Sequence, residues 1–219
     1  MFSLLRPAVA IAVFLLCVST VSYAQQGYRT VTGARSTGAP DTVEVIEFFW
    51  YGCPHCYNFE PYIEKWKKDL PENVTFRYVP AVLSQRWELH GRAFYAAKLI
   101  GVLEPFHGSM FSALHEENRR LTSEQAIGQF VSELGIDREE FIATMNSFAV
   151  ETRIRKARDL QKDYGISGTP SVVVDGTYVT SGSRAGNFKR MIEIMNERVK
   201  QAREELPESS DSRQGDTSG

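Results

Sequence analysis

The sequence predicts an α/β fold in which a block of helices separates a β-α-β unit from a β-β-α unit. Three observations lead to this prediction. Residues 43–50 are dense in β-branched and aromatic side chains, as in a buried strand. Residues 85–164 carry apolar side chains with a helical period, and a strand–turn–strand pattern returns at residues 171–179. This order indicates one α/β core that is interrupted by a helical insertion.

The first unit begins with the strand at residues 43–50, and two closely spaced cysteines follow it directly. The next segment, 57–70, is predicted to be helical because apolar side chains recur at helical spacing and lysines gather at its end. Pro71 ends this helix, and residues 74–79 form the second predicted strand. The apolar positions of the helix are Phe59, Ile63 and Trp66.

The helical block contains several helices with identifiable starts. One helix is predicted from an apolar face with i, i+3, i+4 and i+7 spacing, and Thr122 with Gln125 is expected to form its capping box. Asp137 is expected to cap the next helix, and Gly165 to end the last one. The apolar face comprises Ile127, Phe130, Val131 and Leu134.

The second unit has a hairpin and a final helix. Residues 171–174 and 177–179 are predicted strands, and Asp175-Gly176 between them is a typical hairpin turn. Asn187 is expected to cap a helix that carries an apolar stripe.

The composition is that of an ordinary globular protein. The 219 residues carry a net charge of −2, which argues against a nucleic-acid partner. The expected organisation is a signal peptide, two parts of one domain around an insertion, and a disordered tail. Within it, residues 25–41 are polar and are expected to form a loosely held arm. The predicted segments are 1–24, 25–84, 85–164, 165–205 and 206–219.

The N-terminus has the pattern of a secretory signal peptide. Arg6 precedes the apolar run from Ala8 to Val18, and small residues flank Tyr23 before a cleavage site expected after about Ala24. An uncleaved membrane anchor is the alternative, but the apolar run is short for a membrane span. Because Cys17 lies in the signal segment, only Cys53 and Cys56 remain after export.

The motif Cys53-Pro54-His55-Cys56 predicts redox chemistry. It lies where a strand ends and a helix begins, so backbone N–H groups and the helix dipole favour a thiolate at Cys53. Pro54 suits the first helical turn, and His55 adds a donor or positive charge nearby. Stabilising the reduced form makes a disulfide a stronger oxidant.

Two other interpretations of the cysteine pair are weaker. A structural disulfide that closes so small a loop would stabilise the fold little. A zinc site needs four ligands, and the sequence has no second cysteine pair and no matching histidine spacing. No metal and no separate cofactor are therefore expected, the redox-active disulfide apart.

The motif and its surroundings resemble the DsbA family of periplasmic disulfide oxidases. The similarity covers nearly all of the exported chain, notably residues 48–57, 59–61, 146–148, 168–171 and 174–178. It implies a thioredoxin-like fold with an inserted helical domain. It also implies a monomeric, periplasmic thiol:disulfide oxidoreductase that donates the Cys53–Cys56 disulfide to unfolded or reduced exported proteins. A quinone-linked membrane partner of the DsbB type would re-oxidise it.

Four further residues are candidates for the site. The resemblance implies a cis bond between Thr169 and Pro170, and a substrate peptide that hydrogen-bonds to the backbone of Thr169. The Thr169 hydroxyl is expected to tune the redox poise. Glu47, in the apolar strand, could move protons to Cys56 or reach solvent at the strand end, and Glu60 has the same two interpretations.

Two other functions remain open from the sequence. A disulfide isomerase or reductase would use the same cysteines, although the arm before the first strand is too short for a dimerisation region. A metal-binding or chaperone module without thiol chemistry is the other alternative.

Overall fold

A five-stranded sheet forms the centre of the molecule. The computed structural model describes residues 27–32, 38–39 and 41–206. The strand order is β1-β5-β4-β2-β3, in which β2 and β3 are parallel and the other neighbours are antiparallel. The strands are β1 (Tyr28–Thr30), β2 (Val43–Phe49), β3 (Val74–Pro80), β4 (Ser171–Val174) and β5 (Tyr178–Ser181).

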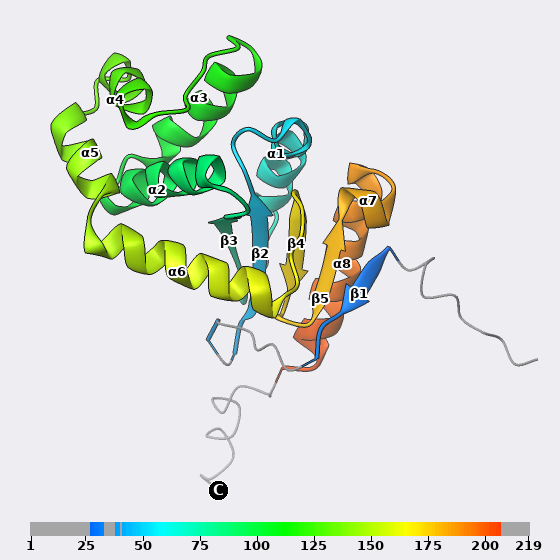
Figure 1. The fold of residues 1–219 in the computed structure, drawn as a ribbon. Coiled ribbons are helices and arrows are strands. Elements are labelled where there is room, and N and C mark those ends of the chain that lie inside the picture. Colours follow the sequence, from blue (N-terminus) through cyan, green and yellow to red (C-terminus); the bar gives the residue numbers. More distant parts are fainter. Residues whose placement is uncertain (1–26, 33–37, 40, 207–219) are drawn as a thin grey trace, which may run out of the picture.

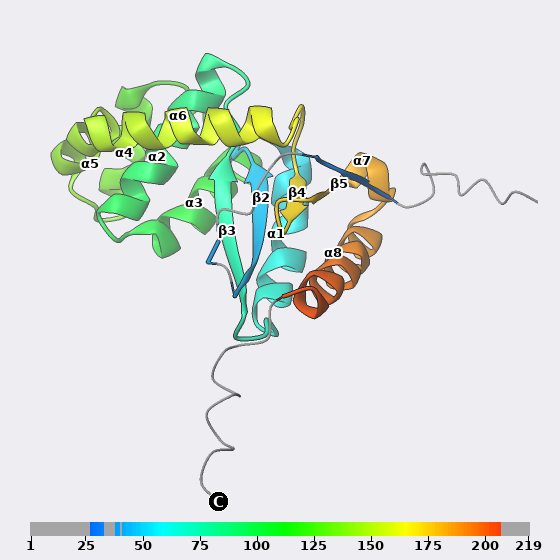
Figure 2. The same ribbon diagram turned by 90° about the horizontal axis from the view of Figure 1, so that it is seen from below.

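The helices form two groups around this sheet (Figures 1 and 2). α1 and α8 pack side by side against the sheet, whereas α2 to α6 gather beside β3. α6 leads from this block back to the loop before β4 (Figure 1). The helices are α1 (Pro54–Lys67), α2 (Gln85–Leu99), α3 (Leu103–His115), α4 (Glu124–Glu133), α5 (Arg138–Met145), α6 (Phe148–Asp163), α7 (Gly182–Ala185) and α8 (Phe188–Glu204).

Because β2 is pleated, it contributes apolar side chains to the cores of both groups of helices. Side chains alternate between the two faces of a strand. Val43 and Val45 join the apolar cluster of α1 and α8, whereas Ile46 and Phe48 join the cluster of the helical block. Every residue of β2 is buried, which accounts for its nearly continuous apolar sequence. Among the helices of the described residues, none is long and apolar enough to span a membrane.

The predicted α/β class with an inserted helical block is confirmed, and two local predictions were wrong. The arm at residues 25–41 includes β1, an edge strand that pairs with β5. Three residues are too few to show a strand pattern, and long-range contacts hold this strand: the Thr180 hydroxyl donates to the Gly27 carbonyl at 2.7 Å. The cap of α4 is Ser123, not Thr122, and its Oγ accepts from the Ala126 N–H at 3.2 Å.

Several predicted features are untested. The signal peptide at residues 1–24, including Cys17, and the tail after Leu206 lie outside the described residues. The bounds of the predicted segments also stay predictions, although the helices from α2 to α6 occupy Gln85–Asp163 between β3 and β4.

Candidate active site

The sheet register brings two distant loops together. β2 and β4 run antiparallel with Phe48 opposite Ser171, so the end of β2 lies beside the start of β4. Cys53 follows β2 closely, and the Thr169–Pro170 bond, which is cis, immediately precedes β4. The predicted cysteine motif and the predicted peptide-binding loop therefore meet at one edge of the sheet.

Cys53 is the N-cap residue of α1. Its Sγ accepts the backbone N–H of Cys56 at 3.4 Å and lies 3.4 Å from the carbonyl oxygen of Thr169. The pKa of Cys53 is lowered to about 5 by the hydrogen bond with the Cys56 thiol, against the effect of burial. The Thr169 side chain and the backbone N–H groups of Cys56 and His55 lower the pKa further. A thiolate is thus favoured at the helix start.

Cys56 differs strongly from Cys53. Its side chain is fully buried, whereas Cys53 keeps 8% of its surface exposed. Burial raises the pKa of Cys56 well above its ordinary value, and the hydrogen bond with Cys53 and the charge of Glu47 raise it further. Both cysteines are free thiols in this structure. The pair is asymmetric: a thiolate is favoured at Cys53, which keeps a small exposed surface, and a protonated thiol is favoured at the fully buried Cys56.

Pro54 and His55 contribute mainly through the backbone. Pro54 occupies the first turn of α1, where an N–H group would have no helical partner. The His55 side chain is exposed, and its backbone N–H is one of several groups that lower the pKa of Cys53.

Glu47 is buried, with 1% of its surface exposed, and its Oε2 atom has no hydrogen-bond partner among the described residues. Burial raises its pKa well above the ordinary value, and the charges of Glu60 and Cys53 add to this effect. The interpretation of Glu47 as a solvent-exposed strand-end residue is therefore wrong. The Glu47 carboxyl group lies close enough to Cys56 that its negative charge, when ionised, raises the pKa of that thiol.

A polar network that no sequence pattern indicated lies near Glu47. The Tyr78 hydroxyl donates to Glu60 Oε1 at 2.7 Å, and His107 Nε2 lies 3.3 Å from the same oxygen. The other ring nitrogen of His107, Nδ1, lies 2.8 Å from the hydroxyl of Tyr51. A single histidine in an apolar helix has no spacing signal, so only the tertiary structure reveals this network. It connects α1, β3 and α3 to the surroundings of Glu47.

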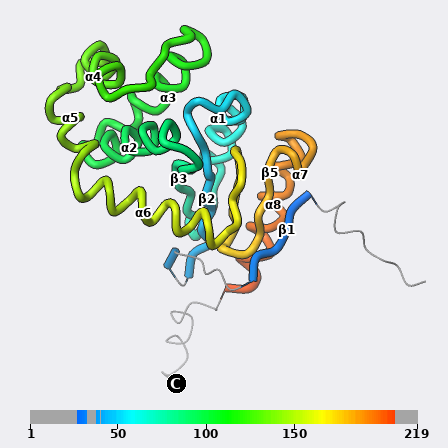
Figure 3. Tube along the Cα trace, viewed as in Figure 1, coloured from blue at the N-terminus to red at the C-terminus, as the bar shows by residue number. Residues whose placement is uncertain are grey.

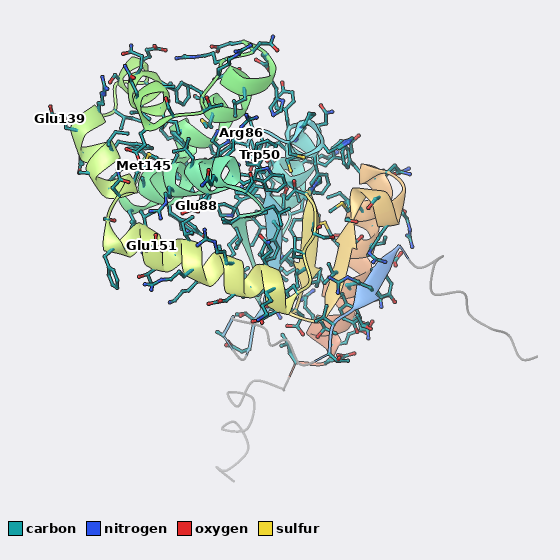
Figure 4. All side chains as sticks on the ribbon, viewed as in Figure 1. Trp50, Arg86, Glu88, Glu139, Met145 and Glu151 are labelled. Carbon is teal, nitrogen blue, oxygen red and sulfur yellow. The ribbon has the colours of Figure 1, made fainter. Side chains whose placement is uncertain are left out.

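The aromatic residues before the motif form core rather than a binding surface. Phe49 and Tyr51 are almost completely buried. Trp50 stacks on Trp87 of α2, with ring centroids 4.5 Å apart and planes at 8°. Figure 4 shows Trp50 where the helical block meets the sheet.

Thr169 presents a buried hydroxyl to the cysteine pair. This hydroxyl lowers the pKa of both Cys53 and Cys56, and it has no hydrogen bond of regular geometry among the described residues. Thr169 and the buried Pro170 also border an open groove that begins beside His55. The carbonyl oxygen of Thr169, its hydroxyl and the groove together form a site where an extended peptide could lie against Cys53.

Comparisons with known proteins agree with this geometry. A model of the DSBA-like thioredoxin domain matches residues 84–193. The thiol:disulfide interchange protein DsbA of Pseudomonas syringae pv. tomato is 35% identical over 176 residues, which are 80% of this chain and 82% of the relative. The DsbA of Bordetella parapertussis is 31% identical and covers 91% of this chain and 96% of its own. The crystal structure of Pseudomonas aeruginosa DsbA is similar with a TM-score of 0.78 at 34% identity, over 82% of this chain and 93% of that one.

Proposed function

The chain belongs to the DsbA family of thiol:disulfide interchange proteins, and from this premise we propose that it is a periplasmic oxidase of newly exported proteins. The observation that supports oxidation of the client, rather than its reduction, is the difference in pKa between the two thiols. The pKa of Cys53 is lowered to about 5, whereas that of Cys56 is raised. A low thiol pKa stabilises the reduced protein and makes the disulfide a stronger oxidant.

The proposed reaction has two exchange steps. A thiolate of the client protein attacks Cys53 Sγ, which forms a mixed disulfide and breaks the Cys53–Cys56 bond. Cys56 leaves with the electron pair and takes up a proton, because its raised pKa disfavours the thiolate. A second client thiolate then attacks the client sulfur of the mixed disulfide, and Cys53 leaves as a thiolate. The client loses two electrons and the protein gains them, while the second proton goes to solvent.

Each site residue has a role in this proposal. Glu47 supplies the proton to Cys56, since it is the buried carboxyl group that influences that thiol. Thr169 offers its backbone to an extended client segment next to Pro170, and its hydroxyl adjusts the pKa of both thiols. Pro54 and His55 shape the helix start so that N–H groups face Cys53.

Location and partners follow from the family and the N-terminal pattern. The protein is proposed to be exported with cleavage after about Ala24, and to act as a monomer on unfolded or reduced exported proteins. Its re-oxidation is assigned to a membrane quinone-linked enzyme of the DsbB type. These assignments rest on the relatives named DsbA and on the signal-like sequence before residue 25.

The redox equilibrium with glutathione tests the proposed direction. The purified protein is equilibrated with mixtures of reduced and oxidised glutathione, and the fraction of Cys53–Cys56 disulfide is measured. An oxidase requires a poise well above that of thioredoxin. A poise at or below that of thioredoxin contradicts the oxidase proposal and favours a reductase. Cys53→Ser is expected to abolish peptide oxidation. Cys56→Ser has no disulfide of its own, and its Cys53 thiolate is expected to attack oxidised glutathione, release one reduced glutathione and remain as the mixed disulfide.

A further inference from the structure

A groove of about 740 Å³ runs from the cysteine motif to the far edge of the sheet. The loop before β4 forms one wall, and the segment from β5 through α7 to the start of α8 forms the other. Figure 3 shows β1, β5 and α7 together at this edge. The groove begins at His55 and reaches Arg29 of β1, and its apolar surface comes from Tyr62, Ile166, Pro170, Val179 and Phe188.

The charged side chains of this groove all have one sign. Arg29, Arg184 and Lys189 line it together with His55, and no aspartate or glutamate does. Arg184 and Lys189 are exposed, and neither has a carboxylate within ion-pair distance among the described residues. The next basic residue of α8, Arg190, does not line the groove and pairs with Glu193 and Glu197. Within the part of the chain that the structure describes, the positive charge of Arg184 and Lys189 in the groove is thus not neutralised by an ion pair.

Two of these cations lie close enough to repel each other. The Arg29 guanidinium donates to the carbonyl oxygens of Tyr164 and Gly165, which fix its position without cancelling its charge. After burial, the charge of Arg184 is the second cause that lowers the pKa of Arg29. A carboxylate placed between the two guanidinium groups would relieve this repulsion.

The start of α8 adds to the positive field. Asn187 caps this helix of 17 residues, and both Phe188 and Lys189 of its first turn line the groove. The positive end of the helix dipole therefore faces the same space as the basic side chains.

We propose that Arg184 and Lys189, with Arg29 beside them, select client segments in which acidic residues flank the reacting cysteine. This inference rests on the proposed oxidase function and names the class of substrate that reacts fastest. The apolar side chains of the groove hold the segment, and the cations steer acidic segments towards Cys53. Charge complementarity of this kind raises the association rate more than the affinity, and salt weakens it.

Peptide oxidation tests the selection. Three peptides share two cysteines and differ only in the flanking positions, which are Glu, Gln or Lys. Oxidised protein reacts with each peptide at about 20 mM and about 500 mM salt. Each rate constant is divided by that for hydroxyethyl disulfide, because flanking carboxylates raise the pKa of the peptide thiols themselves.

The variants isolate the groove. Arg184→Glu with Lys189→Glu reverses the charge of the groove, and Arg155→Glu with Lys156→Glu makes the same change on exposed positions of α6 that do not line it. Arg184→Gln with Lys189→Gln only removes the charge. If the charge-reversed variant does not fold, this charge-neutral variant still tests whether the two cations matter.

In the unchanged protein, the Glu peptide is expected to react about fivefold faster than the Lys peptide at low salt, with a ratio near one at high salt. The reversed groove variant should bring the ratio to one or below, the Gln variant should lower it partway, and the α6 control should preserve it. Equal ratios in the groove variants and the control overturn the inference. Failure of the unchanged protein to oxidise the Gln peptide contradicts the oxidase function, whereas its oxidation without any charge preference contradicts the groove inference alone.

Discussion

The carbonyl oxygen of Thr169 lies 3.4 Å from the Sγ atom of Cys53, although 116 residues separate the two in the chain. The antiparallel pairing of β2 with β4 produces this contact, since it places the end of one strand beside the start of the other. A client segment that pairs with the backbone of Thr169 would present its own cysteine to Cys53. The sheet register therefore places the backbone of Thr169 beside the reactive sulfur.

Titration of the reduced protein should reveal the low pKa of Cys53. The pKa falls from an ordinary value of 9.0 to about 5, so thiolate absorbance near 240 nm should appear around pH 5. The contribution of this thiolate to stability is complete above the unfolded value of 9.0 and is lost as the pH falls through about 5. The oxidised protein has no such thiol to titrate. Urea unfolding of both forms should show the relative stability of the reduced form increasing from pH 5 to pH 9, and a flat difference would contradict the assignment.

Thr169→Val should raise the pKa of Cys53 and make the disulfide less oxidising. The substitution keeps the shape of the side chain but removes the hydroxyl that lowers the pKa of both thiols. The hydroxyl has no regular hydrogen-bond partner among the described residues, so stability should change by less than about 1 kcal/mol. The thiolate titration and the glutathione equilibrium measure both effects. An unchanged pKa would show that the hydroxyl does not act on Cys53.

Glu47→Gln should stabilise the protein at neutral pH and slow its chemistry. The raised pKa of Glu47 means that its stabilising contribution is complete below its ordinary pKa of 4.5 and is lost as the pH rises through the folded value. Glutamine stays neutral, so the stability of the variant relative to the unchanged protein should be greater at pH 8 than at pH 4. Urea unfolding at both pH values measures the difference.

The kinetic part of the Glu47 prediction needs a separate control. The substituted side chain cannot deliver a proton, so formation of the mixed disulfide should slow while the pKa of Cys53 changes little. Tyr57→Phe serves as the control, because it removes a hydroxyl near the motif that bonds to Glu116 on the surface rather than to Glu47. Equal rates in Glu47→Gln and the control would argue against a proton-transfer role.

Gly52→Ala should destabilise the protein although Gly52 needs no unusual backbone angle. A Cβ atom at this position would lie 2.4 Å from Cζ2 of Trp50, whose ring is stacked on Trp87. The indole must move, and such overpacking typically costs about 1–3 kcal/mol. Tryptophan fluorescence and urea unfolding report the displacement and its cost. A variant as stable as the unchanged protein would show that the stack has room to shift.

Local sequence patterns predicted the long helices and strands, because their buried faces require apolar residues at regular intervals along the sequence. The β-branched and aromatic residues of β2 and the apolar stripe of α8 are examples. β1 was missed, since its position depends on pairing with β5 and on the contact of Arg29 with the loop after α6. The order of the strands is likewise a long-range property that no local pattern contains.

The site was predictable to the extent that its residues are adjacent in the chain. Cys53 and Cys56 bracket a helix start, so their asymmetry follows from elementary electrostatics. Thr169 was predicted as a site residue only through the family resemblance. The pairing of β2 with β4, which brings it to Cys53, cannot be read from a local sequence pattern. No sequence pattern identified His107 as part of the polar network, because its partners Tyr51 and Glu60 are distant from it in the chain.

A double-mutant cycle between Tyr51 and His107 should reveal a measurable coupling. The hydroxyl and the ring nitrogen lie 2.8 Å apart in the core, and each is the hydrogen-bond partner of the other. Tyr51→Phe should cost about 1 kcal/mol, because it leaves Nδ1 of His107 without that bond. His107→Ala should cost about 2–4 kcal/mol, since it also opens a cavity among aromatic rings. The double variant should be less destabilised than the sum by about 0.5–1.5 kcal/mol, as measured by urea unfolding. Additive losses would mean that the two groups contribute independently, and that the network behind Glu47 does not act as a unit.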